Sequence, residues 1–308
     1  MPAAPDDTLL IINAEAKGGL PRDYRSTSEA SKHDGIRTAA GLEKLRASAS
    51  GQFSVKGLAA VSKRTGGAPL IVLDLRQESH GFVDGTAVSW FAPRNAGNQG
   101  KTPEQINQDE AALLAGLAGQ PTVTVQKITA KSSDARIEGT EPVSLPARNV
   151  QSEEQLVLAE GAGYTRVPNA DYIPFDNQQV DQLVAFWQSR SPDTWVHVHC
   201  NAGGGRSTTA LVLFDMLENA TTVKLQDVVD RQDELGGNDL LAVRPKPKWR
   251  HDARFSEPSS FVASTSTPGS IPAERARPGR AGRHATRRPP HASSDSVTFG
   301  TVAFGLTL

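Results

Sequence analysis

The sequence predicts an α/β protein with a layered core. Two short apolar runs, Leu70–Leu75 and Trp195–His199, are typical of buried strands. The second run leads directly into a glycine-containing loop and then into a long apolar segment at 207–217, which predicts a buried helix. Strands that alternate with helices in this way indicate a sheet covered by helices.

Other segments combine apolar residues at helical spacing with residues that typically begin or end a helix. Thr102 and Pro103 are suited to begin a helix over 103–117, and Asp176 is suited to cap the helix that follows it. The apolar residues after Asp176 recur at helical spacing from 180 to 187. We expect further helices over 55–63 and 225–235, the second ending at Gly236 and Gly237.

The chain divides into three regions by composition. We expect a flexible segment at 1–19 and a folded domain at 20–257. Within that domain, residues 121–160 hold short extended stretches broken by Gly and Pro, which indicate a β-rich insertion at about 86–150. After about residue 258 Arg, Pro and Ser dominate, so 258–308 is expected to be a disordered tail.

Composition excludes several classes of protein. The chain has 308 residues, 37% hydrophobic and 22% charged, which fits a soluble globular protein. No apolar run approaches the roughly 18 residues of a membrane helix. The N-terminus lacks a basic segment before its short apolar patch, so we expect a cytoplasmic protein or export by a non-classical or effector route. The single cysteine excludes an internal disulfide and a thiolate-rich zinc site.

Charge is distributed unevenly. The net charge of −1 combines +4 in residues 258–308 with −5 in residues 1–257. A polyanionic ligand would therefore need local basic residues on the folded part. Near its end, Lys246, Lys248, Arg250 and Arg254 form such a local cluster, which fits either a phosphate site or an ordinary solvated surface.

The loop after the second predicted strand contains the main candidates for a functional site. Cys200 and Arg206 are separated by five residues, the last three of which are Gly203, Gly204 and Gly205. Backbone N–H groups at the start of a helix favour a thiolate and bind phosphate oxygens, and arginine can grip two of these oxygens. We therefore predict a phosphate-binding loop from Cys200 to Arg206, which includes Asn201 and Ala202. The alternative is a small buried hydrophobic cysteine.

Three further side chains are candidates for catalysis. The Ser207 hydroxyl can donate a hydrogen bond to the sulfur. His199 can either tune the thiol or support the loop structurally. Phosphoester cleavage needs a proton for the leaving alkoxide, and Asp171, on a loop ahead of the preceding helix, can supply it. Sequence position alone fits a surface or capping aspartate equally well.

Several motifs together carry a resemblance to a known family. They are LPRDYRST (20–27), SGQFS (50–54), DLRQESHGFVDGTAVSW (74–90), NAGNQGKT (95–102), GYTRVPNADYIP (163–174), HCNAGGGRSTT (199–209) and RQDELGG (231–237). These segments resemble the protein-tyrosine-phosphatase-like inositol polyphosphate phosphatases, also called cysteine phytases. The resemblance covers about residues 20–257 and implies a phosphatase core with an inserted small partial β-barrel.

The resemblance also implies roles for individual residues. It makes Cys200 the nucleophile, Arg206 the phosphate clamp and Asp171 the general acid. It places substrate-binding basic residues at Arg25 and Arg250. Lys248, two residues before Arg250, and Tyr172, directly after Asp171, are further candidates for substrate binding. Arg76 would either bind substrate or pair with a buried acid.

The sequence departs from the family at four places. Tyr172 stands where the family usually has histidine, Asn201 replaces a commoner glutamate, and Gly204 replaces a larger residue. The family's closing helix is replaced by the Arg-rich tail, which leads us to hypothesise a reading-frame change near Ser264. Coding DNA that yields no family-like helix in another frame would contradict that hypothesis.

The leading functional hypothesis is stepwise hydrolysis of inositol polyphosphates such as phytate through a phosphocysteine. It needs no metal or cofactor, and no nucleic-acid or membrane partner is expected. The alternatives are a protein-tyrosine phosphatase and an inactive module that binds inositol phosphates. The sequence does not specify an oligomeric state.

Overall fold

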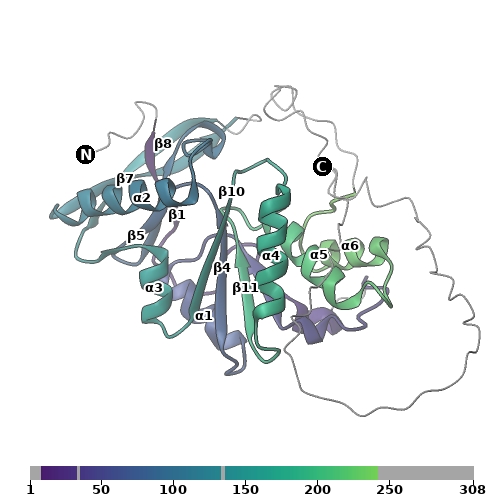
Figure 1. Cartoon of the computed structure of the whole chain (residues 1–308). Helices are drawn as coiled ribbons and strands as arrows, with labels where there is room; N and C mark the ends of the chain where they lie inside the picture. The colour runs from purple at the N-terminus through teal and green to yellow at the C-terminus, as the bar shows by residue number, and fades with distance from the viewer. Residues whose placement is uncertain (1–7, 33–34, 133–135, 242–308) are drawn as a thin grey trace, which may run out of the picture.

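The computed structural model describes residues 8–32, 35–132 and 136–241, which build two β-sheets with helices packed on them (Figure 1). The central sheet has five strands in the order β10-β4-β11-β3-β2. Its strands are β2 (Arg25–Ser26), β3 (Ala47–Ser50), β4 (Leu70–Arg76), β10 (Gly163–Asn169) and β11 (Trp195–His199). Mixed α/β layering of this kind confirms the predicted fold class.

The strand directions of the central sheet position the site. Strands β10, β4, β11 and β3 run parallel, whereas β2 is antiparallel to β3. In the register of the sheet, His199 lies opposite Ser50 on one side and Asp74 on the other. The carboxyl ends of these strands therefore meet at one edge, directly before the loop that begins at Cys200.

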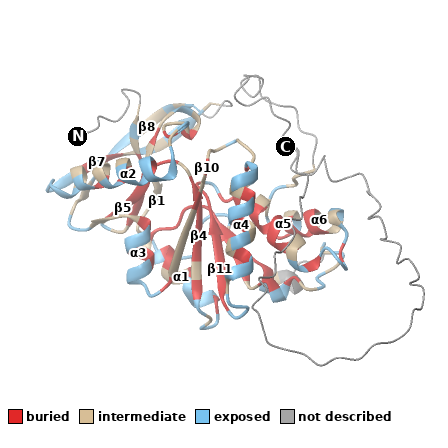
Figure 2. Cartoon of the chain, viewed as in Figure 1, coloured by how far each residue is buried: buried red, intermediate tan, exposed pale blue. Residues whose placement is uncertain are grey.

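One face of the central sheet is covered by α4 (Asn177–Ser189) and α5 (Gly205–Asn219). The rings of Trp187 from α4 and Phe214 from α5 stack with centroids 4.2 Å apart. Beneath them lie buried aliphatic side chains of β4 and β11, and Figure 2 shows both strands largely in the colour of buried residues. Helix α6 (Leu225–Glu234) packs on α5 through Val228 and Val229.

The other face is covered by α1 (Val55–Arg64) and α3 (Glu153–Ala159). Leu58 of α1 and Leu156 of α3 pack in one buried cluster with Val72 of β4 and Phe82 of β5. Because Phe82 belongs to the second sheet, this cluster packs the two sheets against each other.

The second sheet has six strands in the order β8-β7-β1-β6-β5-β9. These are β1 (Leu9–Ala14), β5 (His80–Val83), β6 (Thr86–Phe91), β7 (Thr122–Lys131), β8 (Ile137–Pro146) and β9 (Val150–Gln151). Helix α2 (Pro103–Ala118) lies over it, and its core contains Val83, Val88, Val123 and Val125. Short 3-10 helices span Thr27–Lys32, Glu43–Leu45 and Pro93–Asn95.

Two expectations about domain organisation are corrected. Residues 9–14 are not a flexible lead-in, because β1 pairs with β6 and β7 and buries Ile11. The expected insertion at 86–150 contains α2, and its sheet also recruits β1 and β5 from outside those bounds. The description of this sheet as a partial barrel stays an expectation.

The helical predictions are confirmed with small changes of boundary. Thr102 and Asp176 both form capping boxes, at the start of α2 and α4. The tail at 258–308 lies outside the described residues, as do Lys248 and Arg250. Over the described ranges, no helix combines the length and the apolar character that crossing a membrane requires.

Candidate active site

The catalytic loop lies between β11 and α5. Cys200 directly follows β11 and is 2% exposed, and its Sγ accepts a hydrogen bond of 3.2 Å from the backbone N–H of Gly203. The loop then enters α5 at Gly205, with Gly204 at the N-cap. The sulfur therefore lies at the positive end of a helix, as the sequence predicted.

Gly203 is the position where this loop needs glycine. Its φ is 86°, and a Cβ there would lie 2.4 Å from the backbone nitrogen of Gly51. A Cβ on Gly204 would meet the Asn238 side chain at 3.1 Å, whereas one on Gly205 would meet nothing within 4 Å. The loop thus packs closely against the end of β3 at Gly203, whereas Gly205 has free space beside it.

Arg206 is held in a fixed orientation. Its Nη1 and Nη2 donate to the two carboxylate oxygens of Glu78 at 2.8 and 3.0 Å, and Nη1 also donates to the carbonyl of Asn169 at 2.9 Å. Burial alone would lower the pKa of Arg206. The charges of Asp171, Glu78 and Cys200 outweigh burial and hold this pKa well above its usual value.

Asp171 lies at the rim of the site. Its Oδ1 is 3.5 Å from Nη2 of Arg206, and its Oδ2 accepts a hydrogen bond of 2.8 Å from Asn95. The backbone N–H of Tyr172 donates to Oδ1 at 3.1 Å, and Tyr172 is itself exposed with φ at 65°. The structure brings the candidate acid to the arginine of the loop, which a capping aspartate would not require.

Arg25, expected to bind substrate, contacts the phosphate-binding loop itself, and its role in substrate binding stays an expectation. Arg25 is buried beneath the loop, where it donates to the carbonyl of Gly203 at 2.8 Å and to Oγ1 of Thr208 at 3.0 Å. Burial lowers its pKa to about 10, which leaves it charged at neutral pH. Arg22 is an exposed cation nearby, and its Nη2 donates to the carbonyl of Asn201 at 2.5 Å.

Arg76 pairs with a buried acid, which was the alternative to substrate binding. It is fully buried, its Nε donates to Glu78 at 3.2 Å, and its Nη1 donates to Gln52 at 2.5 Å. Ser207 also departs from expectation, because its hydroxyl donates to the carbonyl of Ser50 at 3.5 Å rather than to the sulfur.

The remaining loop residues lie as follows. Asn201 is buried, and its carbonyl accepts from Arg22 and from the backbone N–H of Gln52. Ala202 is exposed on the outside of the loop. His199 is fully buried, and its Nε2 lies 2.5 Å from Glu153. The imidazole thus faces the interior behind the loop.

A buried cluster of charges lies behind His199. Asp74, Glu153 and His199 each offer a ligand atom, and these atoms lie within 4.8 Å of one another. However, Asp74 also contacts Nε of Arg166 at 3.1 Å and Nε2 of His80 at 3.3 Å. Because cations of the protein already neutralise these carboxylates, we describe the cluster as an ion-pair network.

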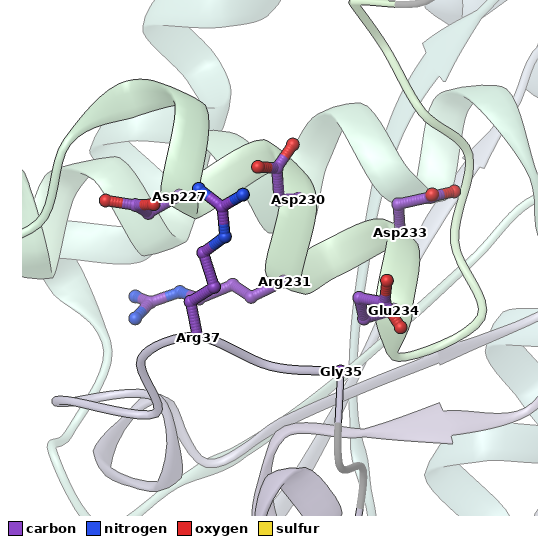
Figure 3. A pocket seen from close by; sticks show the side chains of 7 residues that line it. All are labelled: Gly35, Arg37, Asp227, Asp230, Arg231, Asp233 and Glu234. Carbon is purple, nitrogen blue, oxygen red and sulfur yellow. The ribbon is translucent and has the colours of Figure 1, made fainter.

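A cavity of about 280 Å³ lies elsewhere, between α6 and residues 35–37. Figure 3 shows four carboxylates of α6 around Arg37, those of Asp227, Asp230, Asp233 and Glu234. Its excess of acids is unsuited to a polyphosphate. No residue of the catalytic loop lines it.

Sequence reasoning missed several residues that build the site. Glu78 lies inside the DLRQESHGF motif, and its place beside Arg76 was the available signal. Gln52 and Asn95 lie inside the SGQFS and NAGNQGKT motifs, which assigned neither of them a role, and nothing in the local pattern marks Glu153. Their roles depend on contacts between distant parts of the chain.

A Cys-x5-Arg loop between a parallel strand and a helix, with an aspartate at its rim, defines the class of protein-tyrosine-phosphatase-like folds. The sequence model of the PTP-like phytase family, described as "Inositol hexakisphosphate", matches residues 73–218. This match places residues 73–218 in the PTP-like phytase family, whose fold the solved structures below share.

Two solved structures share this fold. The PTP-like myo-inositol phosphatase from Mitsuokella multacida, in complex with myo-inositol-(1,3,4,5)-tetrakisphosphate, has a TM-score of 0.73 and 34% identity. The match covers 80% of this chain and 42% of that one. A PTP-like phytase from Bdellovibrio bacteriovorus has a TM-score of 0.61 and 28% identity, covering 83% of this chain and 85% of that one.

A curated relative is similar over much of this chain. Effector protein hopD2 from Pseudomonas syringae pv. tomato is 30% identical over 235 residues, which are 75% of this chain and 50% of the relative. The chain thus spans about half the length of this relative, and a smaller share of the Mitsuokella structure.

Proposed function

We propose that this chain hydrolyses phosphomonoesters of inositol polyphosphates through a phosphocysteine intermediate. The observation that carries the proposal is the convergence of three groups. Cys200 Sγ lies at the amide-lined end of α5, Arg206 is oriented by Glu78, and Asp171 lies 3.5 Å from that arginine.

In the first step Cys200 attacks phosphorus, so that an S–P bond forms and the P–O bond to the inositol breaks. The loop N–H groups and Arg206 stabilise the charge on the three equatorial oxygens. Asp171, protonated at the start, gives its proton to the leaving alkoxide. Asn95 holds Oδ2 of Asp171 and so directs the carboxyl toward the reacting phosphate.

In the second step Asp171 accepts a proton from water, whose oxygen attacks phosphorus. The O–P bond forms, the S–P bond breaks, and inorganic phosphate leaves with Cys200 restored. The positive charge at the phosphate comes from Arg206 and from backbone dipoles, so we propose that the reaction needs no metal.

Cations at the rim favour a substrate with several phosphates. Arg22 is exposed beside Asn201. Lys131, at the end of β7, holds its ammonium group 5.6 Å from the ring centre of Phe91. Phe91 lies four residues before Asn95, which donates a hydrogen bond to Asp171. Burial and the charge of Arg22 lower the pKa of Lys131, and the charge of Asp171 raises it. These cations suit phosphates next to the one being cleaved.

The test is phosphate release from phytate in the presence of EDTA, with Cys200→Ser as control. We expect turnover that survives EDTA and is lost, by at least about 10⁴-fold, in the variant. Release that persists in Cys200→Ser, or that requires an added metal, would contradict the mechanism. Faster hydrolysis of a phosphotyrosine peptide than of phytate would favour the tyrosine phosphatase alternative.

We also propose that the protein is exported as an effector. The support is its similarity to effector protein hopD2 over 75% of this chain. A reporter fused to the chain should reach host cells in a manner that depends on the export apparatus of the bacterium. Retention of the reporter in the bacterium would contradict this proposal.

A further inference from the structure

Glu153 links the second sheet to the catalytic loop. It is the first residue of α3, directly after the N-cap Ser152, and it is 1% exposed. A carboxylate at this place is favoured by the helix dipole, but helix stability does not require it to be buried. Its two oxygens reach two different segments of the active site.

One oxygen holds the residue next to the nucleophile. Oε1 of Glu153 lies 2.5 Å from Nε2 of His199. At this distance the imidazole lies against the carboxylate, although the two atoms are not aligned as a hydrogen bond. The ring of Phe53, 4.9 Å away between centroids, packs against the same imidazole. The side chain that precedes Cys200 is therefore fixed in one orientation.

The other oxygen holds the segment on which the loop rests. Oε2 of Glu153 accepts a hydrogen bond of 2.7 Å from Nε2 of Gln52. The backbone N–H of Gln52 donates to the carbonyl of Asn201 at 3.1 Å, and its Oε1 accepts from Arg76. Gln52 cannot reverse its amide without losing one of these side-chain contacts. The orientation of Gln52 is thus determined from both sides.

We propose that Glu153 is a positioning residue of the active site, which sets the phosphate-binding loop by holding His199 and Gln52 on its two sides. The inference rests on the proposed phosphatase function. It assigns the second sheet a part in catalysis, since α3 packs against β5 of that sheet. Displacement of the loop by about 1 Å would be enough to cost about 100-fold in rate.

Positioning and electrostatics make opposite predictions for Glu153→Gln. The substitution removes a negative charge near an anion-binding loop, which by charge alone would tighten anion binding. The new amide also has no charge to hold the imidazole of His199, and it keeps its contact with Gln52 only if its oxygen faces Nε2 of that residue. If the anchors set the loop, anion binding becomes weaker.

The experiment measures inhibition by orthovanadate and hydrolysis of p-nitrophenyl phosphate, well below the unfolding temperature of each variant. We expect Glu153→Gln to raise the inhibition constant of vanadate at least about 10-fold and to lower kcat by about 10- to 100-fold, more than it changes KM. Glu154→Gln, an exposed neighbour on the same helix, is the matched control.

A vanadate constant in Glu153→Gln that is unchanged or lower would overturn the proposal, even if the variant is less stable. If Glu153→Gln does not fold, Glu153→Asp replaces it. That variant keeps the charge and withdraws the carboxylate by one methylene, so the same weakening is expected. Wild-type protein that hydrolyses neither p-nitrophenyl phosphate nor phytate would instead refute the proposed function.

Discussion

Arg206 and Glu78 are joined by two parallel hydrogen bonds of 2.8 and 3.0 Å inside the protein. Burial would raise the pKa of Glu78, but the charges of Arg206 and Arg76 lower it far below its usual range. The carboxylate is therefore ionised at neutral pH. It holds the arginine of the loop in place before any phosphate arrives.

Glu78→Gln should weaken both the fold and the reaction. It leaves two buried guanidinium groups without their shared counter-ion, which costs about 3 kcal/mol or more in the free energy of unfolding. We expect kcat for p-nitrophenyl phosphate to fall at least about 10-fold, because Arg206 loses its fixed orientation. Urea denaturation and steady-state kinetics measure the two effects. Glu138→Gln, on the exposed part of β8, should change neither.

Gly203 and Gly205 provide a matched pair for the same substitution. Gly203→Ala puts a Cβ 2.4 Å from the Gly51 nitrogen at a φ of 86°, so the loop must move away from β3. We expect a loss of about 100-fold or more in kcat/KM. Gly205→Ala meets no atom within 4 Å and lies at the start of α5, where alanine is favourable. Comparable losses in both variants would contradict this reading of the loop.

Asp171→Asn should remove the proton donor and leave the geometry of the loop intact. Proton transfer by a positioned acid contributes about 10²- to 10⁴-fold, and we expect kcat for phytate to fall within that range. Asp193→Asn, an exposed aspartate near Arg46, is the control. A smaller effect on a substrate with an acidic leaving group, such as p-nitrophenol, would support the role of acid. An equal loss with both leaving groups would argue against it.

Much of the fold was predictable because its signals are local. The capping boxes at Thr102 and Asp176, and the apolar runs of β4 and β11, each lie within a few residues. The Cys-x5-Arg spacing fixes the loop in the same way. In each case the residues that determine the element lie within that element or directly beside it.

Other features depend on contacts that no local pattern encodes. Strand β1 has its partner in β6, more than 70 residues away, and its short apolar patch was compatible with a flexible segment. Arg25 and Arg22 are three residues apart with the same chemistry. Only the packing of the loop on β2 and β3 buries Arg25 and leaves Arg22 at the rim. Burial, which decides the role of a charge, is a tertiary property.

His80 should make stability decline in alkaline solution. Burial and the charges of Arg76 and Arg166 lower its pKa, but Asp74 and Glu110 outweigh them and raise it to about 9 from 6.5. Because the folded protein binds this proton more tightly, the stabilisation is fully present below pH 6.5 and is lost as pH rises through about 9. The effect is on the order of 3 kcal/mol.

We expect the unfolding temperature of the wild-type protein to fall between pH 7 and pH 10. His80→Gln should be less stable at pH 6 and should lose less over the same interval, because its side chain carries no titrating proton. Parallel curves for the two proteins would show that His80 does not carry the proton.

Lys131 tests whether the second sheet selects substrates with several phosphates. Its ammonium group lies over Phe91, and desolvation and the charge of Arg22 lower its pKa whereas Asp171 raises it. Lys131→Gln removes one cation from the rim without touching the loop. Lys127→Gln, four residues earlier on β7 where the lysine pairs with Glu15, is the matched control.

The informative quantity is the ratio of kcat/KM for phytate to kcat/KM for p-nitrophenyl phosphate. A phosphate near an exposed lysine gains about 1 kcal/mol, so this ratio should fall about 5- to 10-fold in Lys131→Gln. The decrease should shrink as salt rises from 50 to about 500 mM, because rim charges are screened over a few ångströms at high ionic strength. If both lysine variants keep the wild-type ratio, the selection of polyphosphates has another source.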